Sequence, residues 1–256
     1  MLLGIDHIVI ACGDPDVAAE LLRDEVGLEA GGGGRHERNG TFNRLVWFGD
    51  SYLELMGIFD AALAGTRAIG AATLALLEAG HEGFASFAVA TDDIRDDVAA
   101  LRALGSRIEP PTAGERVRLD GQVVRWQTAV PARVGLDGLP FLIEHEYEGP
   151  EWGEAARRAR AELVHSFGGR ATLARLELAV SEPHVAAARY HQEIGLAVVG
   201  DVDRSIDLPI WPQLLRLERP RPGEPDVTIA IAGTAGSPRS VDVLGCRFLV
   251  EVATPP

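Results

Sequence analysis

The chain has 256 residues, of which 46% are hydrophobic and 24% are charged, and its formal net charge at pH 7 is −14. A chain of this length and composition can bury a large core, so it is expected to fold as one large or two small domains. Its acidity argues against nucleic acids and anionic membranes as partners, because both bind to cationic protein surfaces.

Further classes of protein are excluded by what the chain lacks. All 24 basic residues are Arg, so reactions that depend on a Lys amine, such as Schiff-base formation, are excluded. The four glycines at 31–34 therefore predict a hairpin or loop rather than a phosphate-binding loop. Cys12 and Cys246 are too few for a disulfide framework and are predicted to be small buried hydrophobes. No apolar run approaches about 18 residues and residues 1–4 do not begin a signal peptide, so we expect a cytoplasmic protein.

Residues 4–57 predict a strand, a helix and three further strands. The helix begins at Asp14, has apolar residues at helical spacing and ends at Gly27. His7 in the first strand and Glu54 in the last are both side chains that can bind metals. The predicted strands cover 4–11, a short piece of the glycine-rich stretch, 41–48 and 52–56.

The same order of elements returns in residues 83–148. A helix capped by Asp92 or Asp93 runs to Gly105, and the Ala-rich residues 57–83 before this segment predict a helical connector. The predicted strands of this second segment cover 83–90, 122–128 and 139–147.

A third copy of the unit is visible in the letters themselves. Residues 182–196 align without gaps on residues 14–28, and seven of these fifteen positions are identical. Such a repeat indicates one supersecondary unit used several times, because a single unit cannot bury its own sheet face. Residues 149–170, rich in Glu, Ala and Arg, predict a helical linker between the two halves. The remaining predicted strands cover 172–180, 211–218, 227–232 and 247–252, and the last two have no helix between them.

These modules resemble the vicinal oxygen chelate superfamily, which includes glyoxalase I, extradiol dioxygenases and bleomycin-resistance proteins. More narrowly, residues 33–36, 40–45, 48–55 and 125–126 are similar to bacterial glyoxalase-like domain proteins. The resemblance implies an α+β fold in which repeated βαβββ modules form curled, cup-shaped mixed sheets with helices on the outer face. The expected domains are 1–148, holding the modules 4–57 and 83–148 and their connector, the linker 149–170, and 171–256 with a third module and a degenerate fourth.

In that superfamily the metal ligands come from the first and fourth strands of paired modules. The resemblance assigns His7 and Glu54 to these positions in the first module and Glu144 to the fourth strand of the second. The first strand of the second module departs from the pattern, because Ala85 or Ser86 occupies the matching position. One imidazole and two carboxylates suit Zn, Ni, Mn or Fe and leave positions open for substrate oxygens. The missing fourth ligand is equally consistent with loss of the metal.

The resemblance also places a stretch of the first module at the mouth of the cup. There His36 would serve as an acid/base or as a fourth ligand, while Thr41 and Asn43 would bind substrate. Trp126 would form a wall of the cup or pack in the core. Strand alternation puts His145 on the face opposite Glu144, against a helix or in solvent.

Two hypotheses of function follow. The first is a glyoxalase-like, metal-dependent lyase, isomerase or oxygenase that chelates a small oxygen-rich substrate, with His36 and Glu144 as catalytic residues. The second is a non-catalytic binding or resistance protein that uses the same cup. An extradiol dioxygenase would need a second ligating His in a strand that offers none. Both hypotheses imply a small-molecule partner, and module pairing across subunits in the superfamily makes a homodimer compatible with either.

Overall fold

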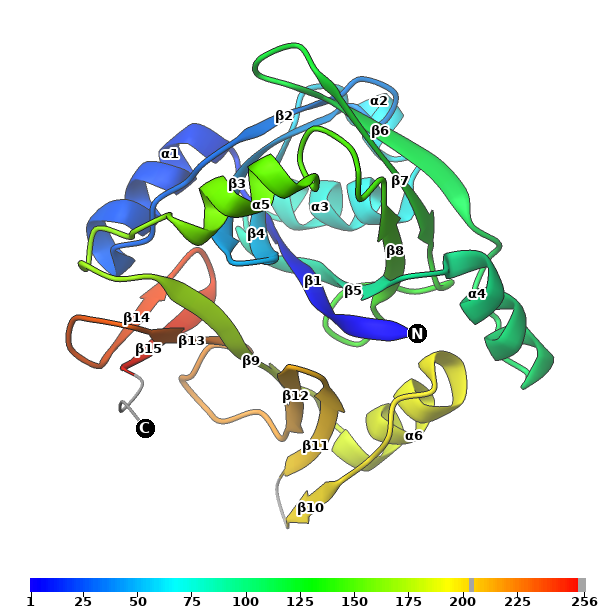
Figure 1. Ribbon diagram of the computed structural model, residues 1–256. Coiled ribbons are helices and arrows are strands. Elements are labelled where there is room, and N and C mark those ends of the chain that lie inside the picture. Colours follow the sequence, from blue (N-terminus) through cyan, green and yellow to red (C-terminus); the bar gives the residue numbers. More distant parts are fainter. Residues whose placement is uncertain (203–204, 253–256) are drawn as a thin grey trace.

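A computed structural model describes residues 1–202 and 205–252, and its strands form two sheets (Figure 1). The first sheet is a closed barrel. Its strands are β1 (Leu2–Ala11), β2 (Gly33–His36), β3 (Thr41–Phe48), β4 (Ser51–Ile58), β5 (Gly83–Thr91), β6 (Thr112–Arg118), β7 (Val123–Ala129) and β8 (Phe141–His145). Around the barrel they follow the order β1-β4-β3-β2-β6-β7-β8-β5.

The barrel consists of two copies of the predicted module. In each copy the first strand pairs in parallel with the fourth, β1 with β4 and β5 with β8. The copies meet through the antiparallel pairs β1–β5 and β2–β6. The β2–β6 pair needs Gly34, because a Cβ atom there would lie 2.0 Å from the carbonyl oxygen of Val117. Both of these antiparallel pairs are needed to close two curled sheets into one barrel.

The helix of the first module forms as the sequence predicts. The helix α1 (Pro15–Leu21) begins after Asp14, whose side chain accepts from the backbone N–H groups of Asp16 and Val17. It continues as a π-helical turn and ends at Gly27, which adopts φ 82°. In the second module α4 (Ile94–Ala103) begins at Asp93 in the same way.

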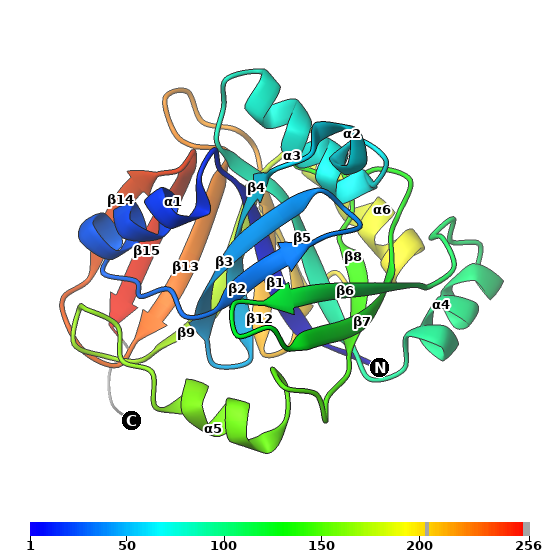
Figure 2. The same cartoon turned by 90° about the horizontal axis from the view of Figure 1, so that it is seen from above.

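Helices close both ends of the barrel (Figure 2). At one end lie α2 (Ala61–Ala64) and α3 (Ala68–Glu78), and apolar side chains of α3 pack against inward residues of the strands. At the other end lie α5 (Glu154–Ala161) and the loop before it, where Trp152 packs against Trp47 and Tyr52. The interior is therefore enclosed by the helical connector and by the segment after β8.

Residues 171–252 form the second sheet and one helix, α6 (Pro183–Ile194), which packs against the sheet. Parallel pairing of β9 with β12 and of β13 with β15 repeats the first-to-fourth pairing of the barrel modules. The strands are β9 (Ala171–Ala179), β10 (Gly200–Val202), β11 (Ser205–Ile210), β12 (Gln213–Glu218), β13 (Val227–Gly233), β14 (Arg239–Val243) and β15 (Cys246–Val252). Their order is β10-β11-β12-β9-β13-β15-β14.

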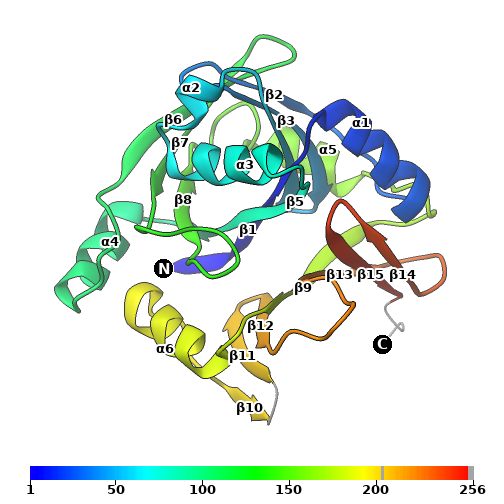
Figure 3. The ribbon, with the colours of Figure 1, turned by 180° about the vertical axis from the view of Figure 1, so that it is seen from behind.

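The main hydrophobic core lies between the barrel and this second sheet (Figure 3). It takes the outward residues of β1 and β4, the residues of β9 and β13 that face them, and both cysteines, which are fully buried as predicted. The predicted α+β class with curled sheets is confirmed, while the strand β6 was not predicted. Within the described ranges, no helix has the length and apolar character needed to cross a membrane.

Candidate active site inside the barrel

The middle of the barrel is polar, although it lies inside an apolar fold. The side chains that meet there come from β1, β2, β3, β4, β6, β8 and the loop after β8, and each residue is at most 7% exposed. They are Asp6, His7, His36, Thr41, Asn43, Glu54, Arg116, His145 and Glu151. Buried polar groups need partners, so their contacts define what this site can do.

A β-bulge in β1 turns two neighbouring side chains, Asp6 and His7, toward this cluster. Ile5 pairs with Val89 of β5, and His7 pairs with the next residue of β5, so Asp6 is one residue in excess on β1. Ile5 and Ile8 on either side both belong to the core outside the barrel. If the strand alternated strictly, counting back from Ile8, the Asp6 side chain would point into that apolar core. The bulge turns Asp6 into the barrel instead.

Asp6 joins two imidazoles. Its Oδ1 lies 2.5 Å from His7 Nδ1, and its two carboxylate oxygens lie 3.1 and 3.0 Å from His145 Nε2. Burial raises the pKa of Asp6, but attraction to His145 and hydrogen bonds with both imidazoles outweigh burial, so that pKa is lowered. An ionised Asp6 can only accept, so His7 Nδ1 and His145 Nε2 are the donors. His7 Nε2 is then the ring nitrogen that faces Glu54.

The Glu54 carboxylate lies between three other side chains. Asn43 Nδ2 donates to Oε1 at 2.6 Å. His7 Nε2 lies 3.5 Å from Oε2, and His36 Nε2 lies 3.7 Å from Oε1. Two imidazole nitrogens therefore approach one carboxylate at distances too long for good hydrogen bonds.

His36 is held by its other nitrogen. Its Nδ1 lies 2.8 Å from Thr41 Oγ1, and its ring meets Trp126 edge-on at 5.7 Å between centroids. Burial lowers the pKa of His36 to about 4; the positive charge of Arg116 adds to this effect and Glu54 opposes it. His36 is therefore neutral near pH 7, and a nitrogen lone pair is available.

The loop after β8 closes this site with two buried contacts. Arg116 Nη2 donates to both oxygens of Glu151 at 2.7 and 2.5 Å, and Arg116 Nη1 donates to Asn43 Oδ1 at 3.1 Å. Trp152 stacks on His145 with 4.2 Å between ring centroids. This loop must move before a molecule can reach the cluster from the α5 end.

The structure does not bring Glu144 together with His7, although the resemblance assigned both to one metal site. The Glu144 side chain lies on the outer side of β8 and accepts from the backbone N–H of Ile94, the first residue of α4, at 2.9 Å. Inward positions of β8 are Phe141, Ile143 and His145, of which the first two pack in the barrel core. His145, which was expected against a helix or in solvent, is the residue of β8 that enters the cluster.

The structure thus brings together His7, His36, Thr41, Asn43, Glu54 and Trp126 of the residues singled out from the sequence. It adds Asp6, Arg116, His145 and Glu151, which sequence reasoning missed. The run Ile5-Asp6-His7 inside an apolar strand was one signal for Asp6. A carboxylate next to a His in a buried strand needs either a bulge that turns it inward or a hydrogen-bonding partner. Arg116 and Glu151 gave no such signal.

Within the described part of the chain, no group of three or more His, Cys, Asp or Glu side chains has the arrangement of a complete metal site. The set that comes nearest is His7, His36 and Glu54. Donor atoms held about 2.0–2.1 Å from a tetrahedral ion lie about 3.3–3.4 Å from one another. The separations of 3.5 and 3.7 Å run from the two imidazoles to different oxygens of Glu54, so they are not the edges of such a site. The donor types suit a divalent ion, but their atoms are not arranged around one point in this structure.

Comparison with known families gives a match over most of the chain. The family described as a glyoxalase-like domain matches residues 5–194, which include the barrel, α5, β9 and α6. None of the curated proteins matches the chain in sequence.

Two solved structures share the overall fold. A hypothetical protein from Staphylococcus aureus is 18% identical over 97% of this chain and 99% of its own, with a TM-score of 0.79. A mutant of 4-hydroxymandelate synthase from Streptomyces coelicolor is 15% identical over 91% of this chain and 71% of its own, with a TM-score of 0.56. A methylmalonyl-CoA epimerase from Streptomyces coelicolor covers 57% of this chain and 96% of its own at 26% identity, with a TM-score of 0.42.

Proposed function

The chain belongs to the glyoxalase-like domain family of the vicinal oxygen chelate superfamily, and from this premise we propose that it is a divalent-metal-dependent enzyme acting on a small oxygen-rich substrate inside the barrel. Members of the superfamily include metal-dependent isomerases and dioxygenases. The observation that carries the proposal is the approach of two anchored imidazoles, His7 and His36, to the carboxylate of Glu54.

His7, His36 and Glu54 would hold the metal. Two imidazoles and one carboxylate suit Zn, Ni, Mn or Fe, and the same set is the one that non-haem iron oxygenases use. When bound, the ion would act as a Lewis acid and stabilise negative charge that develops on substrate oxygens. His36, which the resemblance offered as an acid/base or a fourth ligand, takes the place that the resemblance assigned to Glu144.

The neighbours of these three residues act as positioning residues. Asp6 fixes the tautomer of His7, Thr41 holds His36, and Asn43 holds one oxygen of Glu54. Such outer partners orient metal ligands and raise their basicity, and a carboxylate behind a ligating His is a common arrangement. The cluster has one such partner for each of the three donors.

His145 is the residue that we expect to move a proton. Its Nδ1 is buried and has no hydrogen-bond partner among the described residues, whereas its Nε2 is oriented by Asp6. A ring nitrogen held this way can exchange a proton with a substrate. Trp126 beside His36 would form the wall of the substrate site, and Arg116 would pair with an anionic substrate oxygen once the loop has moved.

A second candidate function is small-molecule binding or resistance without catalysis. It is favoured by the aromatic cluster at the α5 end of the barrel, where Trp47 lies 4.7 Å from Tyr52 and 5.8 Å from Trp152 between ring centroids. Aromatic surfaces of this kind suit a flat apolar ligand. In such a protein the buried polar cluster would fix the orientation of the ligand.

Metal analysis of the purified protein distinguishes the metal-dependent enzyme from the non-catalytic binding protein. The protein is offered Zn, Ni, Mn and Fe in turn, dialysed, and its metal content is measured for wild type, His7→Ala, Glu54→Gln and Glu144→Gln. We expect about one ion per chain in wild type and in Glu144→Gln, and loss of the ion in the other two variants. Asp6→Asn should weaken binding by about 10–100-fold, because Asp6 acts through His7.

Glu144→Gln is the matched control, since it removes a carboxylate of the same barrel that lies outside the cluster. Far-UV circular dichroism checks that every variant is folded. A wild-type protein that retains none of the four metals would overturn the enzyme proposal. Equal metal content in His7→Ala and Glu144→Gln would overturn the assigned ligands.

A further inference from the structure

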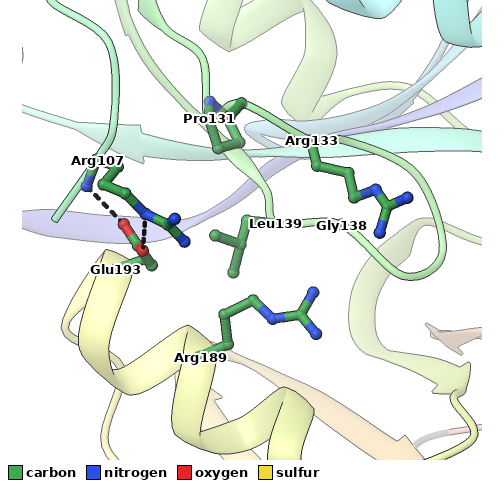
Figure 4. A pocket seen from close by; sticks show the side chains of 8 residues that line it. Arg107, Pro131, Arg133, Gly138, Leu139, Arg189 and Glu193 are labelled. Carbon is green, nitrogen blue, oxygen red and sulfur yellow. Dashed lines mark hydrogen bonds and ion pairs between the residues drawn. The ribbon is translucent and has the colours of Figure 1, made fainter.

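A cavity outside the barrel interior lies where α6 meets the barrel (Figure 4). Its volume is about 240 Å³. Three segments that are distant in sequence line it: the loop after α4, the loop between β7 and β8, and α6 itself. The cavity therefore spans the seam between the two halves of the chain.

Each of the three segments contributes an arginine to this cavity, Arg107, Arg133 and Arg189. Figure 4 shows the guanidinium groups of Arg133 and Arg189 on one side of Leu139 and that of Arg107 on the other. Pro131 and Leu139, both buried, form an apolar wall beside them. Cationic groups thus surround an apolar patch.

The carboxylate in this cavity is already committed to one of the arginines. Glu193 accepts from the backbone N–H and from Nε of Arg107, at 2.6 and 3.1 Å, and from Ser106 Oγ at 3.2 Å. The backbone hydrogen bond from Arg107, with its side chain and Ser106, lowers the pKa of Glu193 against the effect of burial. Glu193 is therefore ionised near pH 7 and offsets the charge of Arg107.

The other two arginines have no carboxylate partner among the residues that the structure describes. Arg189 Nη1 donates to the backbone oxygen of Asp137 at 2.7 Å, and the side chain of Arg133 has no hydrogen bond or ion pair there. In the adjoining sheet, by contrast, Arg216 and Arg247 each bind a carboxylate through two nitrogens. The cavity therefore holds two guanidinium groups without a carboxylate partner among the described residues.

We propose that this cavity is a binding site for a small organic phosphate, with the phosphate between Arg133 and Arg189 and the organic part against Leu139. A guanidinium presents a planar pair of donors that matches phosphate oxygens. A phosphate monoester has three terminal oxygens and a charge of about −1.5 to −2, so it offers two guanidinium groups more acceptor sites and more negative charge than a carboxylate does. The site is independent of the function proposed for the barrel.

Occupation of the cavity would also join the two halves of the chain. Arg133 belongs to the barrel loop and Arg189 to α6, so one phosphate would bridge them. A ligand that binds only the folded state stabilises it in proportion to its occupancy. Phosphate should therefore raise the melting temperature as well as bind.

The test is calorimetric titration of the wild-type protein with inorganic phosphate and with phenyl phosphate at constant ionic strength. We expect both to bind, phenyl phosphate more tightly because its ring can cover Leu139. Arg133→Gln should weaken phenyl phosphate binding by about tenfold, since a hydrogen bond to a charged group is lost. Benzoate replaces the phosphate by a carboxylate on the same ring and is expected to bind at least about tenfold more weakly than phenyl phosphate.

Arg67→Gln is the matched control, because Arg67 is exposed, does not line the cavity and has no side-chain hydrogen bond or ion pair among the described residues. Both substitutions remove one positive charge, so a general electrostatic effect would be the same in each. Absence of phosphate binding to wild type, or equal weakening by Arg133→Gln and Arg67→Gln, would overturn the proposal. Benzoate that binds as tightly as phenyl phosphate would overturn its assignment to phosphates.

Discussion

Replacing Glu151 with Gln should destabilise the fold and open the α5 end of the barrel. The side chains of Arg116 and Glu151 are only 4% and 9% exposed, and Arg116 Nη2 bonds both carboxylate oxygens. The substituted amide keeps one acceptor oxygen but carries no charge, so the buried guanidinium is left with neutral acceptors only, that amide and Asn43. Removing one partner of a buried ion pair costs about 3–5 kcal/mol, because the other charge remains buried without compensation.

Urea unfolding followed by circular dichroism gives the free energy of unfolding, and hydrogen exchange in residues 146–163 reports opening of the loop. Glu154→Gln is the control, since Glu154 pairs with Arg158 on the exposed face of α5 and such surface pairs contribute little. We expect a large loss of stability and faster exchange in Glu151→Gln alone. The double substitution Arg116→Met with Glu151→Leu should recover most of the loss, because it removes both charges.

If Glu151→Gln unfolds at the same urea concentration as Glu154→Gln, the ion pair does not hold the barrel closed. Loss of stability without faster exchange in residues 146–163 would mean that Glu151 supports the interior rather than the loop. Either result would refute the assignment of this loop as the barrier to the site.

Two further predictions concern the β2–β6 strand pair and the contact between α6 and the barrel. Gly34→Ala should destabilise the protein by about 1–3 kcal/mol in urea unfolding, because the new Cβ would overlap the carbonyl oxygen of Val117. Gly31→Ala, where the added Cβ would lie 3.9 Å from the nearest atom, Trp47 Cδ1, should cost less, and equal losses would contradict the role of the β2–β6 pair. The pKa of Glu193 is lower in the folded protein than in the unfolded chain, so the unfolded chain takes up a proton at this group first as the pH falls. The contribution of Glu193 to the free energy of unfolding is therefore present above about pH 4.5 and is lost as the pH falls below that value. Glu193→Gln should therefore flatten the acid loss of stability measured from pH 7 to 3, and an unchanged slope would contradict this role.

The repeated helix start is the part of the fold that the sequence predicts best. Asp-Pro or Glu-Pro followed by apolar residues and a final Gly fixes the helix locally, and both Gly27 and Gly195 adopt the left-handed conformation that ends it. These local signals place β1 and β4 in the same module. Their parallel pairing then brings His7 and Glu54 close enough to meet.

The part that sequence could not predict depends on register. A strand of five residues, Phe141–His145, has too few alternating positions to decide which face is inside, so Glu144 was placed where His145 lies. The strand β6 was missed because most of its residues are polar or small. Its Arg116 is matched by Glu151, 35 residues later, and only the folded barrel brings them together.

The two modules contribute unequally to the interior, and this limits the chemistry to one site. The first module supplies His7, His36, Asn43 and Glu54, whereas the inward positions of the second are mostly apolar and include Ala85, Ala88, Phe141 and Ile143. His145 of β8 is a second-module residue that contacts the polar cluster, and its partner there is Asp6, the extra residue of the bulge in β1. A strand without that bulge would leave His145 with no acceptor and His7 with no anchor. Two contacts therefore connect the polar first module to the mostly apolar second one, the Asp6–His145 contact made by the bulge and the hydrogen bond from Arg116 to Asn43.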